Sequence, residues 1–320
     1  MGFQGKKVFV SGGRTGFLGA NLVEALLKQG ATVFAHSLHA HKSSFFPLAT
    51  PSLIQLTQDL SESATIPLGT DYVFHCAAHT GGAHEMVNNP LAQVNENAKI
   101  NTNILEAARL AKVKKICFIS SSAVYPDSES PLLEEDGFQG DPPGNYFGPA
   151  WMKRYSEKLA EFYSRQHGLD VLVIRPSNIY GPYSSFDLER AHVLPALIRK
   201  FLEAKDEVEV WGVPEVVRDF IFVDDFVEGL FAAFQRKEKF EVFNIATGSD
   251  ITIGAAVEII QELTGFRGRV SFNSQKPMTI KKRRISTAKA ESLLGFTAKT
   301  SFSDGLKKTI HWYQENRRAP

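Results

Sequence analysis

Three glycines near the start of the chain have the spacing of a phosphate-binding loop. Gly13, Gly16 and Gly19 follow the apolar run Val8-Phe9-Val10 and open a segment with helical spacing of leucines. A phosphate needs the backbone close to it and a helix N-terminus pointed at it, and glycine removes the side chains that would block this approach. The same spacing also occurs in tight turns that bind nothing. Its place between a strand and a helix favours a dinucleotide-binding loop.

The segment after the second expected strand bears on which dinucleotide would bind. Enzymes that prefer NAD place a carboxylate there for the ribose hydroxyls, but no acidic residue occurs until Asp59. His39, His41 and Lys42 stand there instead, which favours a 2′-phosphate and hence NADP over NAD. These residues are equally compatible with a solvated loop. Without further metal-ligand residues beside them, the histidines do not indicate a zinc site.

Strands and helices alternate over the first half of the chain and would position these residues. Buried strands are expected at 8–10, 33–35, 72–74, 116–119 and 171–174, and helices at 17–29, 92–111 and 150–167. Continuous apolar strands with helices between them are typical of a parallel sheet covered on both faces. We therefore predict an α/β fold, a Rossmann-type doubly wound sheet. Residues 1–180 would form the dinucleotide-binding domain and 181–320 mostly a smaller C-terminal lobe, interleaved with the sheet.

The composition argues against several classes of function. Hydrophobic residues make up 43% and charged residues 22% of the chain, as in ordinary globular proteins. A formal net charge of +1 gives no general case for binding nucleic acid or a membrane surface. No apolar run approaches the roughly 20 residues that span a bilayer, and no signal-peptide pattern opens the chain. Cys76 and Cys117 lie in apolar runs, which predicts buried thiols and a cytoplasmic protein.

Further motifs extend the pattern along nearly the whole chain, from Lys7 to about Asn316. In addition to the glycine loop they are Asp59-Leu60, His75-Cys76-Ala77-Ala78, Asn97, Ser120-Ser121-Ser122-Ala123-Val124-Tyr125-Pro126 and Arg175-Pro176-Ser177-Asn178-Ile179-Tyr180-Gly181-Pro182. Rarer motifs follow at 192–197, 210–212, 218–220, 223–225 and 310–316. Together they resemble the extended short-chain dehydrogenase/reductases of the NAD-dependent epimerase/dehydratase type. Within that family they are most similar to the GDP-L-fucose synthases.

The resemblance implies a nicotinamide cofactor, NADP or NAD. The residues that would bind it are Gly13, Arg14, Thr15, Gly16, Phe17, Leu18, Gly19, His39, Lys42, Asp59, Leu60, Ala77, Ala78, Asn97, Lys153, Pro176 and Asn178. Asp59 and Leu60 would lie against the adenine. Lys153 would hold the nicotinamide ribose and lower the pKa of a neighbouring tyrosine.

The resemblance also implies a nucleoside-diphosphate sugar as substrate. The residues that would bind it are Ser121, Ser122, Asn178, His192, Lys200, Trp211 and Arg218. A diphosphate needs fixed cations, arginine offers a bidentate fork, and indole packs well on a base or sugar. Trp211 as a core residue and Arg218 as an ion-pair partner of Asp219 remain alternatives. The run Lys281-Lys282-Arg283-Arg284 is either a solvated face or a phosphate-binding segment.

Two departures from the family pattern concern the chemistry. Ser121 would hydrogen-bond the reacting sugar oxygen, but Pro149 occupies the place of the tyrosine that exchanges a proton with it. Proline fits a first helical turn, and a shifted loop would let Tyr146 supply the phenol instead. Ala123 stands where the GDP-L-fucose synthases have a cysteine, so His192 alone would serve as an acid in epimerisation.

The sequence is therefore compatible with two alternative functions. The first is an NAD(P)-dependent epimerase or reductase of nucleoside-diphosphate sugars, with Ser121, Tyr146, Lys153 and His192 as its catalytic residues. Oxidation and reduction at carbon 4 needs no acid or base at the position of Ala123. Double epimerisation at carbons 3 and 5 would need one. The second is a catalytically silent protein that binds a dinucleotide and a sugar nucleotide; a substitution introduced at Pro149 is a further possibility. By resemblance, the helices at 92–111 and 150–167 would form a homodimer.

Overall fold

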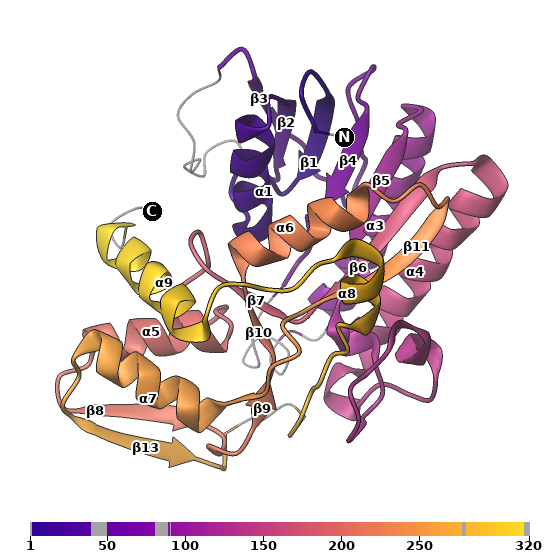
Figure 1. The fold of residues 1–320 in the computed structure, drawn as a ribbon. Helices are drawn as coiled ribbons and strands as arrows, with labels where there is room; N and C mark the ends of the chain where they lie inside the picture. Colours follow the sequence, from indigo (N-terminus) through magenta and orange to yellow (C-terminus); the bar gives the residue numbers. More distant parts are fainter. Residues whose placement is uncertain (1, 40–49, 81–88, 90, 277–279, 317–320) are drawn as a thin grey trace.

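The structure, a computed structural model, describes residues 2–39, 50–80, 89, 91–276 and 280–316 (Figure 1). The strands are β1 (Lys7–Ser11), β2 (Thr32–Ser37), β3 (Leu53–Thr57), β4 (Tyr72–His75), β5 (Lys115–Ile119), β6 (Asp170–Pro176), β7 (Asn178–Tyr180), β8 (Glu207–Trp211), β9 (Val217–Arg218), β10 (Phe220–Phe222), β11 (Phe240–Ile245), β12 (Ile251–Thr252) and β13 (Arg269–Asn273). The α-helices are α1 (Phe17–Lys28), α3 (Ala92–Leu110), α4 (Phe147–His167), α5 (Val193–Glu203), α6 (Val223–Phe234), α7 (Ile253–Thr264), α8 (Ala288–Leu294) and α9 (Phe302–Asn316). Short 3₁₀ helices are η1 (Ser122–Val124), η2 (Glu134–Phe138) and η3 (Gly144–Tyr146). None of the described helices is long and apolar enough to cross a membrane.

Seven strands form one parallel sheet in the order β11-β6-β5-β4-β1-β2-β3. The strand order reverses at β1, which pairs with β2 on one side and with β4 on the other. Ligands of such sheets bind outside the carboxyl ends of the strands at this switch point. The predicted Rossmann-type fold is confirmed, and its switch point lies directly at the glycine loop.

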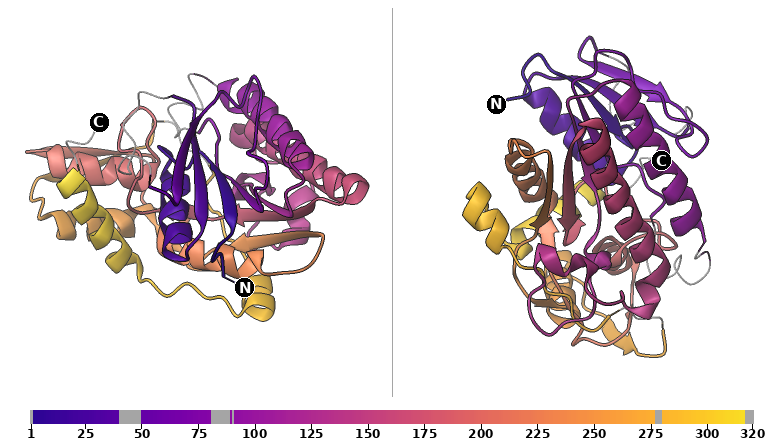
Figure 2. Two further views of the ribbon diagram at one scale, coloured as in Figure 1. Left: turned by 90° about the horizontal axis from the view of Figure 1, so that it is seen from above. Right: turned by 90° about the vertical axis from the view of Figure 1, so that its right-hand side faces the viewer.

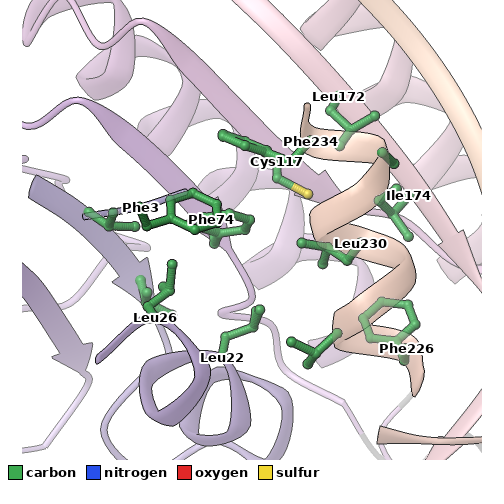
Figure 3. Close-up of a cluster of buried hydrophobic side chains, with 14 of the residues drawn as sticks. Phe3, Leu22, Leu26, Phe74, Cys117, Leu172, Ile174, Phe226, Leu230 and Phe234 are labelled. Atoms are coloured by element: carbon green, nitrogen blue, oxygen red, sulfur yellow. The ribbon is translucent and has the colours of Figure 1, made fainter. Parts of the chain in front are cut away.

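Two apolar layers cover the sheet. On one face α1 and α6 enclose side chains that include Phe3, Leu22, Phe74 and Leu230, all of them buried (Figure 3). On the other face α3 and α4 lie side by side (Figure 2) and enclose a second cluster with Phe118 and other buried side chains. Burying both faces is what the continuous apolar strands require.

A further core lies outside the sheet. It gathers side chains of α5, α7, α9, β8 and β10, most of which lie on the left of Figure 1, with β10 near its centre. The chain then returns to the sheet: β11 pairs with β6, and α6 and α8 pack with the sheet core. Residues 181–320 thus contribute to both cores.

Helix α4 begins earlier than the sequence indicated, at Phe147 instead of residue 150. Pro149 is therefore the third residue of the helix. The N–H groups of a first helical turn have no partner within the helix, so the N–H that proline lacks is not missed. The helix ends at His167 and is capped by Gly168, whose φ of 69° is the left-handed conformation that glycine adopts without strain.

Candidate functional site

The loop between β1 and α1 leaves the N-terminus of α1 open. Within the described chain, the cap residue Gly16 has no side-chain cap, and no acidic residue lies in the first turn. A Cβ on Gly16 would lie 2.6 Å from the carbonyl oxygen of Gly12, and one on Gly12 3.2 Å from Cα of Ala77. The glycines therefore let the loop close against the end of β4. An uncapped helix N-terminus behind a bare loop fits the pyrophosphate of a dinucleotide.

A chain of hydrogen bonds joins this loop to α4. Ser11 Oγ accepts from two backbone N–H groups after β4, so its hydroxyl donates to Nδ1 of His75, 2.8 Å away. His75 therefore carries its proton on Nε2 and donates to Oδ1 of Asn101 at 2.9 Å. Asn101 in turn donates to Oγ of Ser156 on α4. Burial lowers the pKa of His75 to about 3, so this link is neutral at physiological pH.

A second buried histidine, which the sequence analysis missed, fixes the loop from the other side. The N–H of Gly12 donates to Nδ1 of His36 at 3.2 Å, and His36 Nε2 donates to the carbonyl oxygen of Gln58 at 2.8 Å. Burial lowers the pKa of His36, which keeps the ring neutral. Of the residues expected to bind a 2′-phosphate, His39 is exposed and Lys42 lies outside the described residues. An apolar strand that contains one histidine gives no sequence signal for this role.

Of the two residues expected at the adenine, Asp59 is bound to Ser61 and Leu60 is buried in the core. The Asp59 carboxylate accepts hydrogen bonds from N–H and Oγ of Ser61, at 2.8 and 2.7 Å. Leu60 is buried and packs in the core under α3. Arg14 lies nearby, with Nη1 3.5 Å from Oγ1 of Thr57 at the end of β3.

Lys153 and Ser121 both lie at the carboxyl end of β5. The ammonium group of Lys153 donates to the carbonyl oxygen of Ile119 at 2.8 Å and lies 5.1 Å from the ring centroid of Phe118. Burial lowers the pKa of Lys153 to about 8, against the opposing charge of Glu157. Ser121 follows two residues after Ile119 and accepts from the N–H of Ala123 at 3.1 Å. The two residues that the family pattern pairs thus lie at the same strand end.

Tyr146 lies beside two arginines. Burial lowers the pKa of both Arg218 and Arg283, and the phenol of Tyr146 opposes this lowering on both. Tyr146 as a replacement for the missing tyrosine stays a prediction.

The two arginines form a buried cationic pair. Arg218 and Arg283 are 8% and 4% exposed, and Arg218 acts on the pKa of Arg283, which falls to about 10 chiefly through burial. Arg218 donates to the carbonyl oxygens of Val217 and Ile280 at 2.7 Å. Nη1 of Arg283 donates to the carbonyl oxygens of residues 125 and 126, while its buried Nη2 has no hydrogen-bond partner in the described chain. An anion between the guanidinium groups would relieve this unfavourable arrangement.

The contacts of Arg218 and of the basic run at 281–284 bear on the alternatives that the sequence left open. The carboxylate of Asp219 accepts from Thr247 and Gly248, while Arg218 donates to backbone carbonyls. In the basic run at 281–284, Arg283 turns inward, and the next residue, Arg284, pairs with Asp250. The run is therefore not one solvated face.

The remaining predicted residues belong to several elements. Trp211 is half-buried, not core, with the ammonium groups of Lys200 and Lys276 at 5.6 and 5.4 Å from its ring centroid. His192 is exposed at the start of α5. Asn97 holds the backbone of His79 from both sides. Other predicted residues have mainly packing or backbone-binding roles: Phe17 and Leu18 pack on the sheet core, Pro176 is buried, and Asn178 donates to the carbonyl oxygen of Asp219. Within the described chain, no three His, Cys, Asp or Glu side chains are placed to hold a metal ion.

The glycine loop generates the first prediction. Gly16→Val should reduce affinity for NADPH at least tenfold, because its Cβ would lie 2.6 Å from the carbonyl oxygen of Gly12 and displace the N–H groups that face the phosphate. Calorimetric titration of wild type and variant measures this, with circular dichroism to confirm that the variant is folded. Equal affinities would show that NADPH does not bind at this loop.

Comparison with known proteins agrees with this geometry. GDP-L-fucose synthase 1 of Arabidopsis thaliana is 33% identical over 318 residues, 97% of this chain and 94% of that protein. GDP-L-colitose synthase of Yersinia pseudotuberculosis is 29% identical over 89% of this chain and 94% of that protein. A solved structure, a GDP-6-OMe-4-keto-L-xylo-heptose reductase from C. jejuni, has a TM-score of 0.82 at 25% identity and covers 99% of this chain and 100% of its own. The profile of the NAD dependent epimerase/dehydratase family matches residues 8–246. The resemblance predicted from the motifs is confirmed, and the chain belongs to the NAD-dependent epimerase/dehydratase family.

Proposed function

We propose that this protein is an NADP-dependent reductase or 4-epimerase of a GDP-linked sugar. The observation that carries the proposal is the shared placement of the open α1 N-terminus, Lys153 and Ser121 at the carboxyl ends of β1 and β5. A nicotinamide cofactor bound there would supply or accept the hydride. The names of the relatives support GDP as the nucleotide, since the two relatives and the structure compared above all carry a GDP prefix. Ala123 leaves no base where a double epimerisation would need one.

The sugar nucleotide would bind through the buried arginine pair. Two guanidinium groups with an unpaired N–H group can hold a diphosphate by charge-assisted hydrogen bonds. Trp211, flanked by Lys200 and Lys276, offers an indole face for the base. Asn178, Ser122 and His192 stay proposed substrate-binding residues on the resemblance alone.

The arginine pair generates the second prediction. Arg283→Met and Arg218→Ala should each weaken binding of a GDP-sugar about ten- to a hundredfold, because a charged hydrogen bond contributes about 1.5–3 kcal/mol. Thermal shift over GDP-, UDP-, dTDP- and CDP-sugars selects the ligand, and calorimetry measures its affinity. Arg284→Ala is the matched control, since Arg284 adjoins Arg283 but pairs with Asp250. A protein that no sugar nucleotide stabilises would refute the proposed substrate class.

The cofactor preference rests on the end of β2 and β3. The sequence carries no carboxylate from 37 to 58, and the Asp59 carboxylate is occupied by Ser61. Arg14 reaches toward Thr57 at the same edge, and the charge of His39 acts on Asp59. A 2′-phosphate placed there would meet the Arg14 guanidinium group and the His39 ring, which favours NADP over NAD.

We therefore predict that NADPH binds more tightly than NADH. Arg14→Ala should weaken NADPH binding by about tenfold or more and leave NADH binding nearly unchanged, since only the 2′-phosphate loses a charged partner. Both dissociation constants are measured in one buffer at fixed salt. A wild-type preference for NADH would overturn this assignment.

The proposed homodimer would form through α3 and α4. Four aromatic side chains on α4, Phe147, Trp151, Tyr155 and Phe162, are between 40% and 56% exposed. Their spacing of four, four and seven residues places them along one side of the helix. Leu91 and Leu110 are exposed beside α3, which packs next to α4 (Figure 2). Exposed apolar side chains gathered along one side of a helix are typical of an interface.

Light scattering after gel filtration should therefore give twice the chain mass of 35.5 kDa. Tyr155→Glu together with Phe162→Glu should give the monomer mass, because two buried carboxylates facing apolar partners are costly. Leu293→Glu, at a comparably exposed leucine on α8, should leave the mass unchanged. A monomeric wild type would contradict the proposal.

A catalytically silent binding protein is the second candidate, favoured by Pro149. In such a protein the glycine loop and the arginine pair would bind the same ligands as in the enzyme. Only a measurement of turnover distinguishes the silent protein from the enzyme. The free thiols of Cys76 and Cys117 are consistent with the reducing cytoplasm, where we place the protein.

A further inference from the structure

The missing tyrosine leaves the question of which group exchanges a proton with the sugar oxygen. Tyr146 lies at the arginine pair, and Tyr125 is buried with its hydroxyl donating to Asn244. His192 belongs to the start of α5 and not to the end of β5. Glu157 is engaged by Arg175. Of the titratable groups at the end of β5, this leaves Lys153 and its neighbour Cys76.

Lys153 is better suited than Cys76. Burial raises the pKa of the Cys76 thiol to about 12, so this group is a weak acid. Lys153 is a cation, and a cation stabilises the negative charge that develops on a carbonyl oxygen during reduction. Among the described residues, its ammonium group has one hydrogen-bond partner, the carbonyl oxygen of Ile119. Two further N–H groups are therefore available for a ligand.

The geometry of α4 also permits Lys153 to approach the sugar oxygen. Pro149 stands four residues before Lys153, so the two share one side of α4. The short pyrrolidine ring does not extend from the helix as a phenol would. The lysine side chain has a long, flexible stem of four methylene groups. Lys153 can thus approach a sugar oxygen that a tyrosine would otherwise contact.

We propose that Lys153 is itself the general acid and base of this protein, a role that rests on the proposed function. In reduction, the carbonyl carbon of a 4-keto sugar gains a hydride and its two electrons from the reduced nicotinamide. The carbonyl π pair moves to the oxygen, which forms a bond to a proton of the Lys153 ammonium group as that N–H bond breaks. The ketone becomes an alcohol, the cofactor is oxidised, and the neutral amine regains its proton from solvent. Oxidation follows the reverse course.

The pH dependence follows from the groups that face Lys153. Burial lowers its pKa to about 8, Glu157 on the same helix and Cys76 after β4 oppose this, and His75 is neutral. The ammonium form, present below that pKa, is the acid. Reduction should therefore be independent of pH below about 8 and decline above it.

The decisive experiment combines substitutions at 149 and 153. Turnover of a GDP-linked 4-keto-6-deoxyhexose with NADPH is measured for wild type, Lys153→Arg, Lys153→Met and each lysine variant with Pro149→Tyr. Arginine keeps the charge but does not release its proton, so Lys153→Arg alone should lose roughly 10²–10⁴-fold in turnover. Pro149→Tyr should speed the wild type and largely rescue Lys153→Arg, because a phenol then donates beside a retained cation. Pro149→Phe, which has the ring without the hydroxyl, should do neither.

A second readout does not depend on turnover. The extent of acylation of Lys153, followed by mass spectrometry as a function of pH, should have its midpoint near pH 8. NADPH together with the sugar nucleotide should protect Lys153 from acylation. Lys158, exposed on the same helix, serves as the unprotected control. Unprotected Lys153, or equal losses from Lys153→Arg with and without Pro149→Tyr, would overturn the proposal. A wild type that binds both ligands and never turns over would overturn it while the binding assignment stands. A wild type that binds neither would refute the proposed function itself.

Discussion

A buried ion pair between Glu157 and Arg175 holds the carboxyl edge of the sheet together. Arg175 donates from Nε and Nη2 to the two carboxylate oxygens at 3.0 and 2.6 Å, and both side chains are almost fully buried. Glu157 also accepts from Ser120, next to Ser121. Nη1 of Arg175 binds the backbone of Glu134, and a Cβ on Gly137 would lie 2.2 Å from it. Helix α4, strands β5 and β6 and helix η2 are thus fixed to one another at the site.

Such a pair specifies geometry more than it stabilises the fold. Burying two ions costs about as much as their attraction returns, whereas removing one partner alone costs about 3–5 kcal/mol. The neutral chain from Ser11 through His75 and Asn101 reaches the same helix from the glycine loop. Lys153 lies between these two supports, and its protonation is set by burial against the charge of Glu157. A shift of α4 would therefore alter both the position and the acidity of this lysine.

The sequence was informative where one pattern determined one structure. The apolar strands and the glycine spacing predicted the sheet and its loop, because parallel strands must bury both faces. The start of α4 was displaced by three residues, since proline is tolerated in a first turn and does not mark where the helix begins. The role of His36 was missed because it depends on Gly12 and Gln58, which only tertiary structure brings near. The inward turn of Arg283 and the place of Tyr146 beside the two arginines likewise depend on loop paths that composition does not encode.

The central claim is that one site binds cofactor and sugar nucleotide with Lys153 at the reacting oxygen. A crystal structure of the complex with NADP⁺ and a GDP-hexose tests it most directly. The account predicts the cofactor pyrophosphate at the N-terminus of α1, the sugar diphosphate between Arg218 and Arg283, and the ammonium group of Lys153 within hydrogen-bond distance of the oxygen on carbon 4. A sugar bound with that oxygen against another side chain, and with Lys153 directed away from it, would contradict the account.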